Sequence, residues 1–297
     1  MSKLQRREIL AGYLLASPWI IGFILFVGGP MVASVLLSLT DWNLLGDPKW
    51  IGLENYRTLL KDELVIQSLK VTTYYAFTSV PLRVILGLLL ATLLNQKLKL
   101  RSFFRTIYYL PSISSGVAVS ILWVWLLNSE YGLINYFLGL IGIKGPAWLS
   151  DSRYVIPAFV LMSLWGVGGS MLTYLAGLQG IPTEYYEAAE VDGAGIIQRF
   201  RYITLPLVSP IVFFNLVTGL IAALQIFTQG FIMTGGGPHN SSLFFVLYLY
   251  RNAFQLLRMG YASALAWVLF VYIFLLTLLI LRSSSFWVYY TSPTEGK

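Results

Sequence analysis

The sequence predicts an all-α integral membrane protein that crosses the bilayer six times. Of its 297 residues, 57% are hydrophobic and only 11% are charged, which is not the composition of a soluble globule. The apolar residues also gather in runs that reach the length of about 20 residues needed for a spanning helix. The charged residues fall mainly between these runs. We therefore expect one membrane domain over residues 1–297, without a soluble domain.

The expected spans follow the apolar runs in chain order. A basic head precedes 32 uncharged residues (9–40), a run longer than the apolar core of about 7–15 residues in a signal peptide. This run is expected to be a retained first helix, which Pro18 and Pro30 bend without breaking. The six spans are expected at about residues 13–37, 71–95, 106–128, 155–178, 203–231 and 259–281, surrounded by membrane lipid.

The distribution of Lys and Arg predicts the orientation. The amino terminus, the turn near residues 96–105, the loop 179–201 and the tail hold eleven Lys and Arg in roughly 60 residues. The loops of the opposite side hold eight in roughly 94. Because cytoplasmic loops are enriched in Lys and Arg, we expect a multi-pass protein with both termini in the cytoplasm.

Several kinds of chemistry are excluded by residue usage. The chain has no cysteine and a single histidine, His239, so no metal site is expected. The glycines of Thr234–Pro238 lack the Gly-Lys-Ser/Thr ending of a phosphate loop and are expected to form a turn. The net charge of +7 is scattered through short loops, which argues against nucleic-acid binding. No cofactor site and no catalytic group is expected in this chain.

The loop of residues 179–201 is polar although it lies between two apolar runs. Pro182 can open a helix and Gly193 can close one, which predicts a short helix from about residue 183 to residue 192. Its glutamates recur at every third position and share one face: Glu184, Glu187 and Glu190. Ala188 and Ala189 leave another flank low enough for close approach. The helix is either a solvated loop element or a surface presented to a partner.

The spacing in this loop resembles a known signature. Glu187-Ala188-Ala189 is followed after three residues by Gly193, and after nine more by Ile203, one residue and Leu-Pro. This pattern is similar to the cytoplasmic EAA loop of the membrane subunits of binding-protein-dependent ABC importers, where it forms a coupling helix in a cleft of the ATPase subunit. The resemblance implies a type I ABC importer permease fold. It also implies ATPase coupling through seven residues: Glu187, Ala188, Ala189, Asp192, Gly193, Leu205 and Pro206.

Within that family, the chain looks like the carbohydrate importers of the maltose and glycerol-3-phosphate class. The similarity is sharpest from Pro182 to Pro210 and includes the segments Trp50–Tyr56 and Thr234–Pro238. It implies half of the translocation path for a sugar in a prokaryotic inner membrane. The implied partners are a second homologous permease subunit, two ATPase subunits that bind ATP and Mg, and an extracellular solute-binding protein. The alternatives are an amino-acid or inorganic-ion ABC permease, and a membrane scaffold or receptor outside the ABC class.

Two features inside the spans are candidates for the path. At 100° per residue, the polar side chains of the fifth span fall within an arc of about 80°: Asn215, Thr218, Gln225 and Gln229. Either a neighbouring helix or a hydrated path must satisfy their amides. Arg83 lies near the middle of the second span, where an arginine costs about 2.5 kcal/mol or more without a partner. It is expected either in an inter-helix contact or on the path.

The fourth span carries a similar stripe of small residues: Ser163, Gly166, Ser170, Thr173 and Gly177. Small side chains allow helix backbones to approach closely, so this stripe favours packing over substrate contact.

Overall fold

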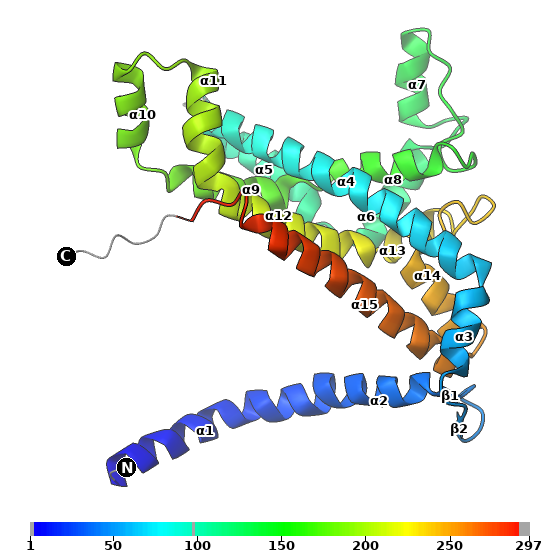
Figure 1. The fold of residues 1–297 in the computed structure, drawn as a ribbon. Helices are drawn as coiled ribbons and strands as arrows, with labels where there is room; N and C mark the ends of the chain where they lie inside the picture. Colours follow the sequence, from blue (N-terminus) through cyan, green and yellow to red (C-terminus); the bar gives the residue numbers. More distant parts are fainter. Residues whose placement is uncertain (1–2, 97–98, 291–297) are drawn as a thin grey trace. The chain divides into compact units, whose positions relative to one another are not determined.

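The computed structural model describes residues 3–96 and 99–290, and these are predominantly helical (Figure 1). The strands in the described residues are β1 (Thr40–Asp41) and β2 (Lys49–Trp50), an antiparallel pair in which Thr40 faces Trp50. By length and composition, four described helices could cross a membrane, or up to six if each of two bent helix pairs is one span. The predicted all-α class is confirmed, and the number of six spans stays a prediction.

The chain divides into two compact units, of which the first comprises residues up to Asp62 together with Leu249–Phe270. It contains α1 (Lys3–Phe23), the π-helical turn η1 (Ile24–Gly28), α2 (Gly29–Ser38) and α3 (Glu54–Lys61). Helical structure continues through Pro18 and Pro30, as expected. The buried Asn55 amide donates to the carbonyl oxygens of Ser38 (2.8 Å) and Thr40 (2.9 Å), which holds α3 to the end of α2.

The second unit comprises Glu63–Tyr248 and the chain from Val271 onward. Its centre is α4 (Glu63–Asn95), a helix that runs through Pro81 and packs against α8 (Val155–Trp165), α9 (Gly168–Gln179) and α12 (Leu205–Leu224). The other elements that lie wholly in this unit are α5 (Arg101–Ile113), α6 (Gly116–Leu126), α7 (Leu133–Leu140), α10 (Thr183–Val191), α11 (Ile196–Arg199), η2 (Phe200–Thr204) and α13 (Thr228–Met233). Two helices have residues in both units, α14 (Phe245–Tyr250) and α15 (Met259–Ser284), and η3 (Arg251–Gln255) belongs to the first unit.

Glycines allow the helices of the second unit to approach closely. A Cβ at Gly87 in α4 would lie 3.0 Å from the Ser170 hydroxyl and 3.1 Å from the Tyr174 ring, both on α9. Gly177 at the other end of α9 packs directly on the Ile211 side chain of α12. Close packing was the predicted role of the small residues in the fourth span, and Gly177 has it.

Three of the expected spans are not continuous helices in the structure. The third is broken at Ser114 and Ser115, where α5 and α6 meet at 100°, and the fourth bends by 47° between α8 and α9. The fifth ends at Leu224, and helical structure resumes only at Thr228. Hydropathy records how apolar a run is, but helix ends depend on local bonds. At the first break, Ser114 Oγ donates to the Leu110 carbonyl oxygen, a bond that competes with the backbone ladder.

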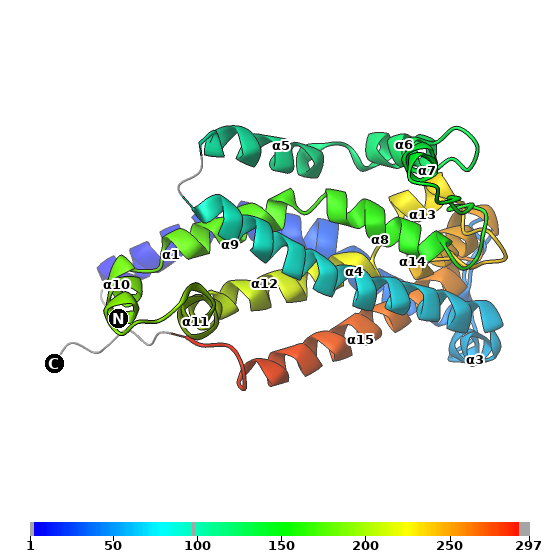
Figure 2. The ribbon, with the colours of Figure 1, turned by 90° about the horizontal axis from the view of Figure 1, so that it is seen from above.

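The second unit has two distinct ends (Figures 1 and 2). The helices α10 and α11 lie at the end where α4 finishes and α5 begins, and α7 lies at the opposite end. The end of α4, the start of α5 and the loop 179–201, which the sequence assigned to one side of the membrane, therefore lie at one end of this unit. The orientation in the membrane stays a prediction.

Candidate functional site

The loop of residues 179–201 contains the helix that the sequence predicts. α10 runs from Thr183 to Val191, directly after Pro182. It ends because Gly193 adopts a φ of +78°, which lets the Gly193 amide donate to the Glu190 carbonyl oxygen (3.0 Å). The Ala194 amide donates to the Ala189 carbonyl oxygen at 2.8 Å. This pair of bonds satisfies carbonyls at the helix end and gives Gly193 the role of a left-handed cap.

Two side-chain contacts fasten α10 to the segment that follows it. Arg199 Nη1 lies 3.0 Å from Glu190 Oε2, and the Tyr186 hydroxyl lies 2.9 Å from the Thr204 hydroxyl. The Glu190 side chain is 72% exposed, so the ion pair contributes about 0–1 kcal/mol and serves mainly to orient the helix. Glu184 and Glu187 are exposed and form no ion pair within the described residues.

The loop also exposes apolar side chains that sequence reasoning missed. Val191 is 89% exposed, Ile196 79% and Ile197 81%. The sequence could have indicated these residues, because aliphatic side chains in an otherwise charged loop do not contribute to its hydration. Ile196 and Ile197 line a cavity of about 610 Å³, together with residues near the end of α4. Exposed aliphatic residues beside an acidic helix form a surface that can bury both apolar area and charge against a partner.

The predicted coupling residues fall into two groups in the structure. Glu187, Ala188 and Ala189 lie on α10, and Asp192 and Gly193 form its carboxyl end. The remaining pair, Leu205 and Pro206, lies at the start of α12, which continues directly from the π-helical turn η2. Only the first group is therefore part of the exposed helix.

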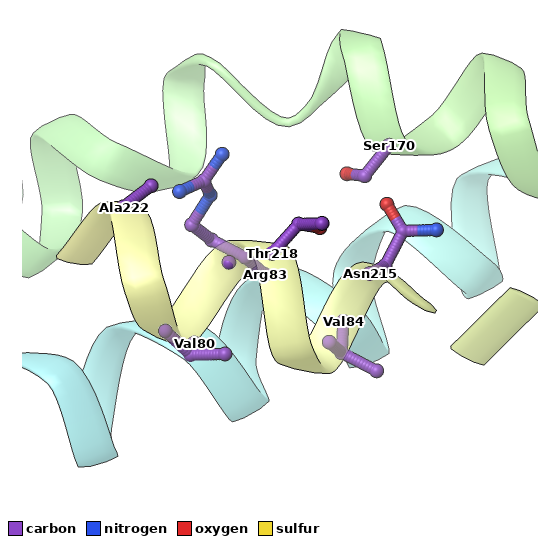
Figure 3. A pocket seen from close by; sticks show the side chains of 8 residues that line it. Val80, Arg83, Val84, Ser170, Asn215, Thr218 and Ala222 are labelled. Atoms are coloured by element: carbon purple, nitrogen blue, oxygen red, sulfur yellow. The ribbon is translucent and has the colours of Figure 1, made fainter. Parts of the chain in front are cut away.

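A polar cavity lies among the apolar helices of the same unit. It has a volume of about 240 Å³ and is bounded by α4, α9 and α12. The predicted path residues Asn215 and Thr218 line it, together with Arg83 and Ser170, and Figure 3 shows their side chains around this space. Asn215 Nδ2 donates to the Ile211 carbonyl oxygen (2.9 Å) and Thr218 Oγ1 to the Phe214 carbonyl oxygen (2.7 Å). The Asn215 side-chain oxygen remains available as an acceptor.

A second cavity, of about 340 Å³, shares Arg83 and Ser170 with the first. Its other polar lining residues come from four elements: Tyr75, Ser112, Ser114, Ser163 and Gln229. The expectation of one continuous helical stripe is wrong beyond Leu224, because the chain leaves the helix there. Gln229 nevertheless reaches the cavity through α13, which packs on α6. Gln225 caps α12 and lines neither cavity.

Arg83 is the positively charged residue that lines both cavities. Its Nε atom is buried without a hydrogen-bond partner, and Arg83 forms no salt bridge with any described residue. Ser163, Gly166 and Ser170 line the second cavity, so these members of the fourth-span stripe border open space, and packing alone does not describe their position.

Apolar helices around a polar cavity, with an exposed acidic and aliphatic loop at one end, are consistent with a membrane transport subunit. Residues 83–290 match the family described as binding-protein-dependent transport system inner membrane component. The match covers more than half of the chain, which therefore belongs to this family.

Full-length relatives support the assignment. The chain is 45% identical over 299 residues to the probable ABC transporter permease protein YesP of Bacillus subtilis (strain 168), covering 99% of this chain and 96% of YesP. It is 34% identical to the trehalose/maltose transport system permease protein MalF of Thermococcus litoralis, covering 96% and 97%. The predicted family is thereby confirmed, and the chain is an ABC transporter permease.

The fold has a solved counterpart. One chain of a bacterial alginate ABC transporter, solved in complex with an alginate pentasaccharide-bound periplasmic protein, superimposes with a TM-score of 0.82. The two chains are 27% identical, and the match covers 95% of each. The permease-like helical fold that the resemblance implied is thus confirmed.

Proposed function

We propose that this chain forms half of the translocation path of an ATP-driven importer for a sugar or sugar derivative. Family membership supports the transport role, and the names of MalF and of the alginate transporter support a carbohydrate. The observation that carries the proposal is the presence, in one compact unit, of an exposed docking loop and a cavity lined by neutral hydrogen-bonding groups. Hydroxyls and amides match the donors and acceptors of a sugar.

The loop 179–201 docks an ATPase subunit. The carboxylates of Glu184 and Glu187 supply charge, and Val191, Ile196 and Ile197 supply apolar area next to them. ATP and Mg bind to that partner, because this sequence contains no phosphate-binding motif, and the permease itself performs no hydrolysis.

The assembled importer contains a second homologous permease subunit, two ATPase subunits and an extracellular solute-binding protein. The periplasmic protein in the alginate transporter structure supports the last of these partners. The chain lies in the plasma membrane with both termini in the cytoplasm, which follows from the Lys and Arg distribution and from the cytoplasmic position that docking requires for α10.

Reconstitution tests the proposal. The permease pair and its ATPase are incorporated into proteoliposomes, and uptake of labelled oligosaccharides and of labelled amino acids is measured with and without the binding protein. We expect sugar uptake that depends on both ATP and the binding protein. Uptake of amino acids without sugar uptake would contradict the carbohydrate assignment, and absence of any ATP-dependent uptake would contradict the transport role.

A further inference from the structure

Arg83 has a charge that no acidic residue in the described part of the chain neutralises. It lies twelve residues before the end of α4, which places it about 18 Å along the helix from Asn95. The helices that enclose the cavities, α4, α5, α6, α8, α9, α12 and α13, contain no Asp or Glu beyond Glu63 at the start of α4. The Nε–H of Arg83 is buried and has no acceptor within the described residues. The Arg83 side chain as a whole is half-buried, and a guanidinium among apolar helices requires an anion, several acceptors or water.

The position of Arg83 is unusual for a purely structural cation. It lines both cavities, and Ser170 is the other lining residue that they share. Figure 3 shows the guanidinium extending from α4 across the cavity toward the ribbon of the neighbouring helices, with Ser170 and Asn215 farther along the same space. The charge therefore borders open volume on two sides and is not enclosed between packed side chains.

The groups around Arg83 are neutral and suited to hydroxyls. Asn215, Thr218 and Ser170 border the first cavity, and Tyr75, Ser163 and Gln229 border the second. The volumes of about 240 and 340 Å³ are close to the lower end of the range for small-molecule sites, about 300–1,000 Å³. One fixed cation among neutral donors and acceptors matches a ligand with one carboxylate and several hydroxyls.

We propose that Arg83 binds the carboxylate of an acidic sugar, such as a uronic acid residue, during its passage through the permease. The inference rests on the proposed function, since it names the class of sugar that the path accepts. The guanidinium presents paired N–H donors that fit a carboxylate in a bidentate geometry, and such charge-assisted bonds are stronger than those to a neutral hydroxyl. The surrounding amides and hydroxyls then hold the ring hydroxyls.

The test compares an acidic probe with a neutral probe in the complete importer. Binding of a galacturonic acid disaccharide and of the corresponding galactose disaccharide to the detergent-solubilised complex is measured by calorimetry. We expect the wild type to bind the acidic probe about 10- to 100-fold more tightly than the neutral one. Arg83→Gln should remove this difference between the two probes, and Arg83→Lys should keep part of it.

Three results would overturn the proposal. The first is equal binding of both probes by the wild type, and the second is an unchanged acidic preference in Arg83→Gln. The third is loss of assembly in Arg83→Gln that Arg83→Lys restores without an acidic preference, because Arg83 would then pair with a carboxylate of another subunit. Binding of neutral sugar without acidic preference rejects this inference alone, whereas absence of binding to both sugars also contradicts the proposed function.

Discussion

Replacing Gly193 with alanine isolates the contribution of the α10 cap to docking. Gly193 has a φ of +78°, a conformation that costs a residue with a Cβ about 1–2 kcal/mol. A Cβ at this position would meet nothing within 4 Å, so no steric clash adds to the backbone cost. In the free permease, the Gly193→Ala variant can relax by opening the carboxyl end of α10. Binding of the ATPase subunit must then restore the cap and with it the backbone cost. The ATPase affinity is therefore expected to fall about 5- to 30-fold.

The matched control is Gly195→Ala. Gly195 lies two residues later in the same exposed loop, but its φ of −70° and ψ of 168° are accessible to any residue, and its Cβ would lie 3.7 Å from Gln198 Oε1. Gly193→Asn should lose less affinity than Gly193→Ala, because asparagine tolerates positive φ. The assay is titration of detergent-solubilised permease with purified ATPase subunit. Equal losses in Gly193→Ala and Gly195→Ala, or no loss in either, would refute the reasoning.

Four further predictions follow from the same structure. Ala188→Trp keeps an exposed position on α10 but blocks close approach, so ATP-dependent uptake should disappear while membrane insertion, measured by fractionation, is unchanged. Asn215→Ala or Gln229→Ala should lower sugar uptake with ATPase assembly intact, and loss of assembly in both would indicate a packing role. Because the chain has no cysteine, Gln179→Cys should resist an impermeant thiol reagent in intact cells and react in inverted vesicles. The purified permease should hydrolyse no ATP, and turnover free of contaminating ATPase would contradict this.

The sequence was sufficient for features that depend on composition and local chemistry. The helix after Pro182 and its end near Gly193 were predicted within one residue, because proline and glycine act through their own backbone preferences. The position of Arg83 in a polar space was one of two expected outcomes, since an arginine among apolar residues must meet either a partner or water.

Features that depend on tertiary contacts were not predictable. Nothing in the run after Thr218 signals the helix end at Leu224, and the next helix, α13, packs on α6. Tyr75 and Ser163 share a cavity with Gln229 although they lie in three separate spans, and no spacing within one run relates them. Ile196 and Ile197 could have been recognised from their aliphatic side chains, but their exposure required the three-dimensional arrangement.

One uninterrupted helical segment joins the docking loop to the cavity. The segment Ile196–Leu224 includes α11, the π-helical turn η2 and α12, and its first residue borders α10 while Asn215 borders the cavity. The nineteen residues between Ile196 and Asn215 correspond to about 28 Å of helix. A rod of this length acts as a lever: tilting it by about 10° about its Ile196 end displaces Asn215 by about 5 Å, more than the length of a hydrogen bond. A small rotation imposed on the loop is thus geometrically enough to exchange the partners of a polar group in the membrane interior.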